Sequence, residues 1–339
     1  MHLSDPAKAV ATAVPLLEVE DLVVEFRQRG RVVRAVNHVS LTLGQGETLG
    51  IVGESGSGKS VLCRSFLRLL PSPPAVVTAS RISFNGQNLP DLTEDQMQAI
   101  RGTDISMVFQ NPMGALNPVW PIGDQITEGE VVRGRLAPAN RRKRAIELLT
   151  RVGIPAPELR VDEYPHQWSG GMVQRAVIAM AVAGAPKLIL ADEPTTALDV
   201  TIQNQILALL MELQAETGTA LILVSHDLAV VAESCDRVAV MYAGRIMEIA
   251  PTDRIFVAPK HAYTLGLLGS IPRIEGGDQA LEPIPGQPPN LADLPPGCPF
   301  APRCRFASSA CAGADMTLRE VAPGHFSACI RANELGGVA

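Results

Sequence analysis

GESGSGKS, residues 53–60, follows the short apolar run 48–52 and precedes a segment with apolar residues at helical spacing. It fits the pattern G-x-x-x-x-G-K-S/T. Its glycines let backbone N–H groups converge on phosphate oxygens, because a Cβ atom would block the turns of such a loop. The following helix would offer its positive N-terminus to the anion. We therefore predict a phosphate cradle on a strand–loop–helix unit, made by Gly53, Ser55, Gly56, Ser57, Gly58, Lys59, Ser60 and Val61.

Within this loop, two side chains have specific predicted tasks. Lys59 would reach the β- and γ-phosphates of a nucleotide, and the hydroxyl of Ser60 would hold Mg²⁺. The alternative is a glycine-rich turn with an accidental Lys-Ser pair. That alternative leaves the flanking strand and helix patterns unexplained.

Two acids end a second apolar run, LILADE, residues 188–193. Parallel sheets gather their ligands at the carboxyl ends of the strands. Asp192 would therefore ligate the Mg²⁺, and Glu193 would act as general base on the attacking water. Taken alone, the motif also fits a solvated pair of acids at a strand end.

Two more polar side chains follow apolar runs. His226 comes after residues 220–225 and could hydrogen-bond the γ-phosphate, whereas Gln110 comes after residues 105–109 and could contact the Mg²⁺ or the water. The alternatives are a helix cap made by Ser225 with a bystander histidine, and a surface amide.

A second anion-binding device is predicted at WSGGM, residues 168–172, where a Ser-Gly-Gly turn opens a helix. Ser169, Gly170 and Gly171 would present backbone N–H groups to a phosphate. The chain thus has two phosphate-binding segments, residues 53–60 and 168–172, but only one of them is a nucleotide cradle. The second device is therefore expected to serve the nucleotide of a partner.

The remaining pattern predicts an α/β fold. Residues 17–26, 31–36 and 38–43 alternate apolar and polar side chains and predict short antiparallel strands. Buried-strand patterns at 188–190 and 220–224 flank a helical pattern over 202–213, and 238–249 reads as a hairpin turning at Ala243-Gly244. Strands separated by helices imply a largely parallel sheet covered on both faces. Residues 112–168 predict a helical insertion, in which Gly153 ends a helix, and residue 70 is expected within the helix that follows the cradle.

Composition narrows the function classes. The 339 residues are 46% hydrophobic, which excludes wholesale disorder, and 29 basic against 35 acidic residues give a net charge of −6, which counts against a nucleic-acid partner. The longest apolar stretch, 176–186, is far shorter than the ~20 residues of a membrane-spanning helix. The first residues lack the pattern of an export signal. We expect a cytosolic chain that docks on another protein.

In this order, the motifs resemble the ATP-binding subunits of ABC transporters over about residues 17–258. Residues 53–60 resemble the Walker A motif, 188–193 the Walker B motif, 168–172 the signature, 196–199 the D-loop and 225–227 the switch-histidine motif. Gln110 takes the Q-loop position, and Phe26 lies where the family stacks an aromatic ring on adenine, although a strand core residue explains Phe26 nearly as well. Trp168 and Met172 depart from the usual signature but leave Ser169 and Gly171 in place.

The resemblance implies a P-loop NTPase fold of the ABC type, with a mixed sheet, an antiparallel β subdomain, a helical insertion and a small Cys-rich C-terminal extension. We expect a flexible leader at 1–15, a nucleotide-binding domain at 16–258 with its helical subdomain at about 112–168, and the extension at 259–339. It also implies a head-to-tail ATPase pair that encloses two ATP molecules. Membrane subunits would dock near residues 111–130 and the helical insertion, where 118–122 are apolar and Pro-containing.

Residues 109–118, 261–268 and the tail resemble the oligopeptide/dipeptide and nickel importer branch, with Ala262 where Pro is usual. This implies a D-type subunit paired with a different, F-type ATPase, two permease subunits and an extracytoplasmic binding protein, at the cytoplasmic face of the membrane. Peptides are the first substrate choice, and nickel, opines or oligosaccharides remain open. A soluble ABC ATPase of DNA repair or translation is the competing class, disfavoured by the single cassette without a long coiled-coil insertion.

Four of the six cysteines, Cys298, Cys304, Cys311 and Cys329, crowd the tail. The absence of paired C-x2-4-C knuckles disfavours structural zinc, whereas four thiolates can hold a 4Fe–4S cluster. The importer resemblance favours the cluster further. Zinc, free thiols and disulfides remain alternatives. Arg303 and Arg305 are expected to offset the negative charge of a cluster, and His325 is an additional candidate ligand.

Overall fold

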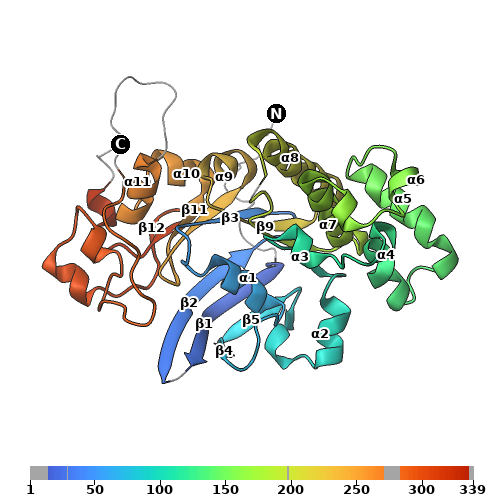
Figure 1. Ribbon diagram of the computed structural model, residues 1–339. Coiled ribbons are helices and arrows are strands. Elements are labelled where there is room, and N and C mark those ends of the chain that lie inside the picture. The colour runs from blue at the N-terminus through green and yellow to red at the C-terminus, as the bar shows by residue number, and fades with distance from the viewer. Residues whose placement is uncertain (1–13, 29, 197, 271–282, 336–339) are drawn as a thin grey trace, which may run out of the picture.

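The computed structural model describes residues 14–28, 30–196, 198–270 and 283–335. The predicted leader therefore lies outside the described residues except for its last two positions, and so does Ala197 of the D-loop motif. Figure 1 shows two sheets at the centre, a helical subdomain at one end and the C-terminal extension at the opposite end.

The larger sheet has eight strands in the order β12-β13-β11-β10-β3-β9-β8-β7. Strands β10, β3, β9, β8 and β7 are parallel, as the sequence predicts, and β11, β13 and β12 extend the sheet in antiparallel fashion. Their bounds are β3 Thr48–Val52, β7 Ile105–Val108, β8 Leu188–Asp192, β9 Ala220–Ser225, β10 Arg237–Tyr242, β11 Arg245–Pro251, β12 Arg319–Ala322 and β13 His325–Ser327. The predicted hairpin at 238–249 is confirmed: Tyr242 pairs with Arg245 across Ala243 and Gly244, both with positive φ.

The second sheet is antiparallel. Strand β1 (Leu17–Gln28) pairs with β2 (Arg31–Leu43), β4 (Ala75–Thr78) and β5 (Arg81–Phe84), and β6 (Gln87–Asn88) follows β5. The predicted antiparallel pairing is confirmed, but the strands are longer than expected, because the patterns over 31–36 and 38–43 both belong to the single strand β2. His38 takes a positive φ of 56°, and the pairing with β1 shifts register nearby. Such an irregularity re-aims the side chains without ending the strand.

Helix α1 spans Lys59–Phe66, so Leu70 lies beyond its end, contrary to expectation. The predicted insertion contains helices over most of its length. Helix α5 (Arg141–Arg151) ends two residues before Gly153, whose φ of 73° suits the turn after a helix end. The other helices are α2 Glu94–Ile100, α3 Pro112–Ala115, α4 Ile122–Val132, α6 Pro157–Arg160, α7 Gly170–Ala183, α8 Val200–Thr217, α9 Leu228–Ser234, α10 Thr252–Val257 and α11 Ala262–Gly269. Short 3-10 turns lie at Leu89–Asp91, Pro138–Asn140, Pro165–Gln167, Ala301–Arg303, Ser309–Gly313 and Ala332–Glu334.

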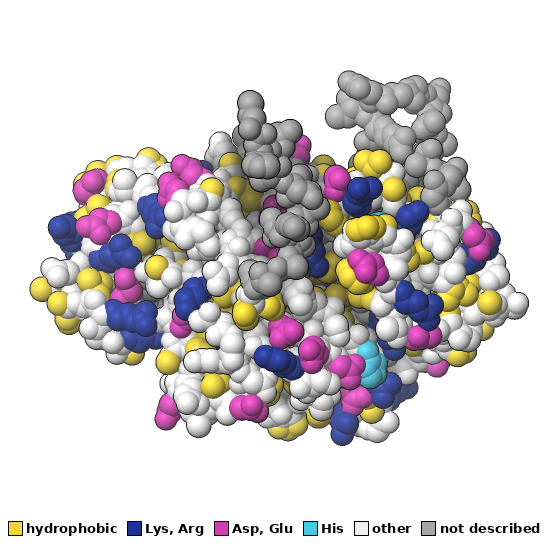
Figure 2. Space-filling view, turned by 180° about the vertical axis from the view of Figure 1, so that it is seen from behind, with side chains coloured by type: hydrophobic (Ala, Val, Ile, Leu, Met, Phe, Trp, Pro, Cys, Tyr) yellow, Lys and Arg dark blue, Asp and Glu magenta, His cyan; other side chains and the backbone are white. Residues whose placement is uncertain are grey.

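The larger sheet is buried on both faces, which explains its nearly continuous apolar strands. Along β8, Leu188 and Leu190 pack in the core shared with α1 and the antiparallel sheet, whereas Ile189 and Ala191 pack in the core shared with the helices α7 and α8. This alternation follows from the two-residue period of a strand. Because both faces of the strand pack in the core, the end of the strand is held in place, and so are the polar residues that follow it. On the face shown in Figure 2, basic and acidic side chains are interspersed.

Candidate functional site

The P-loop, residues 53–60, connects the end of β3 to α1 as predicted. Gly58 has a φ of 102°, and a Cβ atom there would lie 2.1 Å from the carbonyl oxygen of Ala35. Gly53 is equally constrained, because its Cβ would lie 2.0 Å from the carbonyl oxygen of Met241. Only glycine fits at these positions.

Lys59 is buried at the start of α1. Its Nζ donates to the carbonyl oxygens of Gly53 at 2.8 Å and Glu54 at 3.0 Å. Burial lowers the pKa of Lys59, whereas the nearby carboxylates of Glu193 and Asp192 raise it. The ammonium group of Lys59 therefore links the last residues of the loop to its first two, and it is a cation that could bind an anionic ligand there.

Ser60 and Asp192 meet at the end of β8, 132 positions apart in the sequence, where Ser60 Oγ donates to Asp192 Oδ1 at 2.7 Å. Asp192 is fully buried, its Oδ2 has no hydrogen-bond partner, and burial raises the pKa of its carboxyl group. Among the described residues, the nearest cation to Oδ2 is Arg64, whose Nη2 lies 3.8 Å away, beyond hydrogen-bond distance. A buried carboxylate oxygen without a hydrogen bond, beside a hydroxyl, is a donor set that suits a hard divalent cation. These residues therefore fit Mg²⁺.

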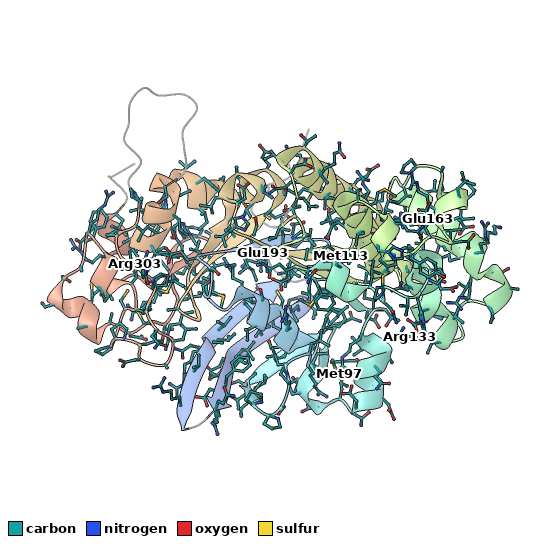
Figure 3. The ribbon with its side chains drawn as sticks, in the orientation of Figure 1. Met97, Met113, Arg133, Glu163, Glu193 and Arg303 are labelled. Carbon is teal, nitrogen blue, oxygen red and sulfur yellow. The ribbon has the colours of Figure 1, made fainter. Side chains whose placement is uncertain are left out.

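Glu193, after β8, contacts residues that follow the two neighbouring strands. Its Oε2 accepts from Gln110 Nε2, after β7, at 2.9 Å and from Thr196 Oγ1 at 2.8 Å, and it lies 3.6 Å from His226 Nδ1, after β9. Figure 3 places Glu193 in the middle of the molecule. Its φ of 47° is unusual for a non-glycine residue, as is common at functional sites. Thr196 belongs to the D-loop motif, but its contact with Glu193 was not predicted.

Two of the open alternatives differ from the structure. Asp227, not Ser225, caps α9 with its side chain, and His226 Nδ1 faces Glu193 at 3.6 Å. Gln110 is no isolated surface amide, and its amide nitrogen faces Glu193 rather than the Mg²⁺-binding pair.

Other predicted residues lie apart from this cluster. Ser169 caps α7, accepting from the N–H of Met172, and it is exposed together with Gly170. Within the described residues, neither Ser169 nor Gly171 hydrogen-bonds to the P-loop. Phe26 and Val61 are partly buried against the core beneath the antiparallel sheet.

The four tail cysteines converge on one apolar cavity, which Phe300, Phe306 and His261 also line. Burial raises the pKa values of Cys298, to about 11, and of Cys304 and Cys329. In the described part of the chain, no three His, Cys, Asp or Glu side chains are arranged around one metal ion. The quartet therefore does not form a single-ion site such as the zinc alternative requires.

Two sequence expectations about the tail are wrong. Arg303 pairs with Glu54 of the P-loop rather than with the cysteines. His325 is bound to Glu248 and is absent from the cysteine cavity.

Comparison with known proteins agrees with this geometry. Residues 36–196 match the family described as ABC transporter, and residues 247–311 match the oligopeptide/dipeptide transporter C-terminal region. The chain is 52% identical over 293 residues to the oligopeptide transport ATP-binding protein OppD of Bacillus subtilis (strain 168), covering 86% of this chain and 82% of the relative. This chain belongs to the ABC transporter family.

Other relatives of this ABC family chain point the same way. It is 49% identical over 321 residues to the probable peptide ABC transporter ATP-binding protein y4tR of Sinorhizobium fredii, covering 94% and 96% of the two chains. The solved dimeric structure of MJ0796, a bacterial ABC transporter cassette, superposes with a TM-score of 0.62 at 29% identity and covers 70% of this chain and 98% of that one. The predicted fold class is thus confirmed. No helix in the described ranges has the length and apolarity to cross a bilayer.

Proposed function

We propose that this chain is the ATP-hydrolysing subunit of an ABC importer for peptides. The observation that carries the proposal is the joint placement of the P-loop, the Ser60–Asp192 pair and the Glu193 cluster at one edge of the parallel sheet. The names of the relatives, an oligopeptide and a peptide transporter subunit, support peptides as the cargo over nickel, opines or oligosaccharides.

In the proposed reaction, the P-loop glycines and Lys59 bind the triphosphate, and Ser60 and Asp192 hold Mg²⁺. When bound, the metal offsets charge on the phosphate oxygens. Glu193 accepts a proton from the attacking water, and His226 and Gln110 orient the reacting groups from either side of it. Phe26 stacks on the adenine.

A second ATPase subunit completes the site. Ser169 and Gly170 lie exposed and Gly171 half-buried at the N-terminus of a 14-residue helix, a position that suits contact with a phosphate held by another chain. The related MJ0796 cassette has a dimeric structure bound to ADP and Pi. We propose a head-to-tail pair with a different, F-type subunit, and domain limits of 16–258 for the ATPase and 259–339 for the extension.

The helical subdomain offers the docking surface for the two permease subunits. A groove there is lined by Pro118, Val119, Leu159, Asp162, Glu163, Tyr164, His166 and Gln167. Val119 is 72% and Leu159 77% exposed, whereas Ile122 of the predicted apolar segment is fully buried. Solvent-exposed apolar side chains beside acidic ones suit an amphipathic helix of a membrane partner. This docking would place the chain at the cytoplasmic face of the membrane.

The cysteine cavity is proposed to hold a 4Fe–4S cluster. Each cysteine in such a site ligates a different iron atom, so the sulfur atoms need not surround one ion. The apolar lining and the convergence of all four cysteines support this assignment. Anaerobic purification with iron and acid-labile sulfide analysis tests it, and Cys304→Ser should lose the cluster.

The central experiment measures nucleotide binding and hydrolysis by Glu193→Gln. We expect the variant to bind MgATP with near wild-type affinity while hydrolysis falls about 10²- to 10⁴-fold, the usual contribution of a general base. Glu216→Gln, at an exposed ion pair with Arg151, is the matched control. Full hydrolysis by Glu193→Gln would remove Glu193 from this role. Peptide uptake by cells that carry the wild-type or variant transporter tests the cargo.

A further inference from the structure

Glu54, inside the P-loop, is held by a side chain from the far end of the sequence. Arg303 donates from Nη1 to Glu54 Oε2 at 2.6 Å and from Nη2 to Oε1 at 2.9 Å, across 249 positions. The guanidinium side chain is 7% exposed and the carboxylate 25%. Such a two-pronged, mostly buried pair fixes both partners in orientation as well as in distance.

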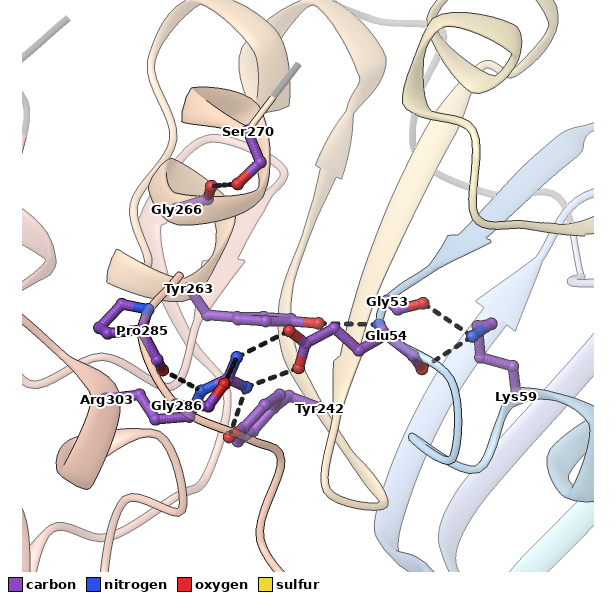
Figure 4. Close-up of polar contacts among 10 residues, drawn as sticks. All are labelled: Gly53, Glu54, Lys59, Tyr242, Tyr263, Gly266, Ser270, Pro285, Gly286 and Arg303. Carbon is purple, nitrogen blue, oxygen red and sulfur yellow. Dashed lines mark hydrogen bonds and ion pairs between the residues drawn. The ribbon is translucent and has the colours of Figure 1, made fainter. Parts of the chain in front are cut away.

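The extension holds Arg303 firmly in place. Its Nε donates to the carbonyl oxygen of Pro285 at 2.8 Å, and its Nη1 donates to the hydroxyl of Tyr242 at 3.2 Å (Figure 4). Pairing with Glu54 raises the pKa of Arg303 above its ordinary value. Arg303 therefore stays charged and is held beside Glu54 of the P-loop.

Glu54 is restrained at its backbone as well. Its N–H donates to the hydroxyl of Tyr263, on α11, at 2.9 Å, and its carbonyl oxygen accepts from Lys59 Nζ. The extension thus contacts Glu54 at its carboxylate, through Arg303, and at its backbone N–H, through Tyr263. A carboxylate in the P-loop repels phosphate unless a cation neutralises it.

We propose that Arg303 is a positioning residue for nucleotide binding that acts through Glu54: it neutralises this carboxylate, which would otherwise repel the phosphates from the P-loop. The C-terminal extension thereby becomes part of the nucleotide site without touching the nucleotide. This inference rests on the proposed role of the P-loop in binding ATP.

The test is equilibrium binding of Mg²⁺ and a fluorescent mant-ATP to the full chain, together with the ATP dependence of hydrolysis. We expect Arg303→Gln to weaken binding about tenfold, which corresponds to about 1.4 kcal/mol, and to raise KM while kcat changes less than about threefold, as expected when ground-state binding is lost. The double variant Glu54→Gln, Arg303→Gln should recover affinity to within about threefold of wild type, because the uncompensated charge is gone.

Three variants make the outcome decisive. Arg319→Gln, at an exposed ion pair with Asp315 in the same extension, should leave affinity unchanged. Glu54→Gln alone should bind at least as tightly as wild type, and it carries the test if Arg303→Gln does not fold. Lys59→Ala should bind no mant-ATP.

Binding of Arg303→Gln within twofold of wild type, no recovery in the double variant, or a tenfold loss in Glu54→Gln would overturn the role of Arg303. Absence of mant-ATP binding by the wild-type chain would instead overturn the proposed function itself.

Discussion

A buried carboxylate joins the ATPase sheet to the extension and allows a quantitative prediction. Glu248, on β11, has no solvent exposure, and its Oε1 lies 2.6 Å from His325 Nε2, on β13. The hydroxyl of Thr264 and the backbone N–H of Lys260 also donate to the carboxylate. Because β13 is the strand through which the extension continues the main sheet, this pair lies at their junction.

The perturbation is His325→Ala. Removing the hydrogen-bond partner of a buried polar group costs about 1–3 kcal/mol, and more when the group that is left is charged. Here the hydroxyl of Thr264 and the N–H of Lys260 still donate to Glu248. We therefore expect a loss of about 3 kcal/mol in the free energy of unfolding.

The assay is urea unfolding followed by circular dichroism, with the slope m compared between variants to check that one transition is being measured. His38→Ala is the matched control, because its pair with Asp21 is half exposed and should contribute less than about 1 kcal/mol. Replacing both partners, as Glu248→Met with His325→Phe, should restore most of the stability. A loss below 1 kcal/mol in His325→Ala would refute the reasoning.

Three further outcomes are expected. Burial lowers the pKa of His261 to about 3. As the pH falls, this histidine therefore takes up its proton near pH 6.5 in the unfolded chain but only near pH 3 in the folded chain, and the free energy of unfolding falls by up to about 1.4 kcal/mol per pH unit between those values. His261→Asn should flatten this slope in unfolding measured from pH 7 to 4, and equal slopes in variant and wild type would contradict the prediction. Gly58→Ala should weaken MgATP binding at least about tenfold, because its Cβ would clash with the carbonyl oxygen of Ala35 and because the left-handed φ costs a residue with a side chain about 1–3 kcal/mol. Unchanged affinity in a binding titration would count against this prediction. Val119→Asp should leave ATP affinity intact but reduce co-purification with the permease subunits; undiminished co-purification would move the docking surface elsewhere.

Sequence reasoning located the site residues that follow strands. Asp192 and Glu193 end an apolar run, and the parallel arrangement of such runs brings Gln110 and His226 to the same edge. The reasoning worked because the ends of adjacent parallel strands are neighbours by construction. It placed Thr196 in the D-loop motif but did not predict that the hydroxyl of Thr196 donates to Glu193, because a motif match carries no information on side-chain direction. It also expected shorter strands than β2, because a positive φ at His38 shifts the alternation within one continuous strand.

The amino-acid order by itself determined the phosphate loop, the acids after β8 and the membership of the chain in its family. These features depend on contiguous residues whose backbone freedom and charge act locally. Only the tertiary structure decided that the extension adds two strands to the ATPase sheet and that the cysteines share one cavity. It also decided that Arg303 pairs with Glu54 and that Glu248 pairs with His325. Such pairings join residues that lie tens to hundreds of positions apart, and they arise from strand order and burial, which leave no local trace in the sequence.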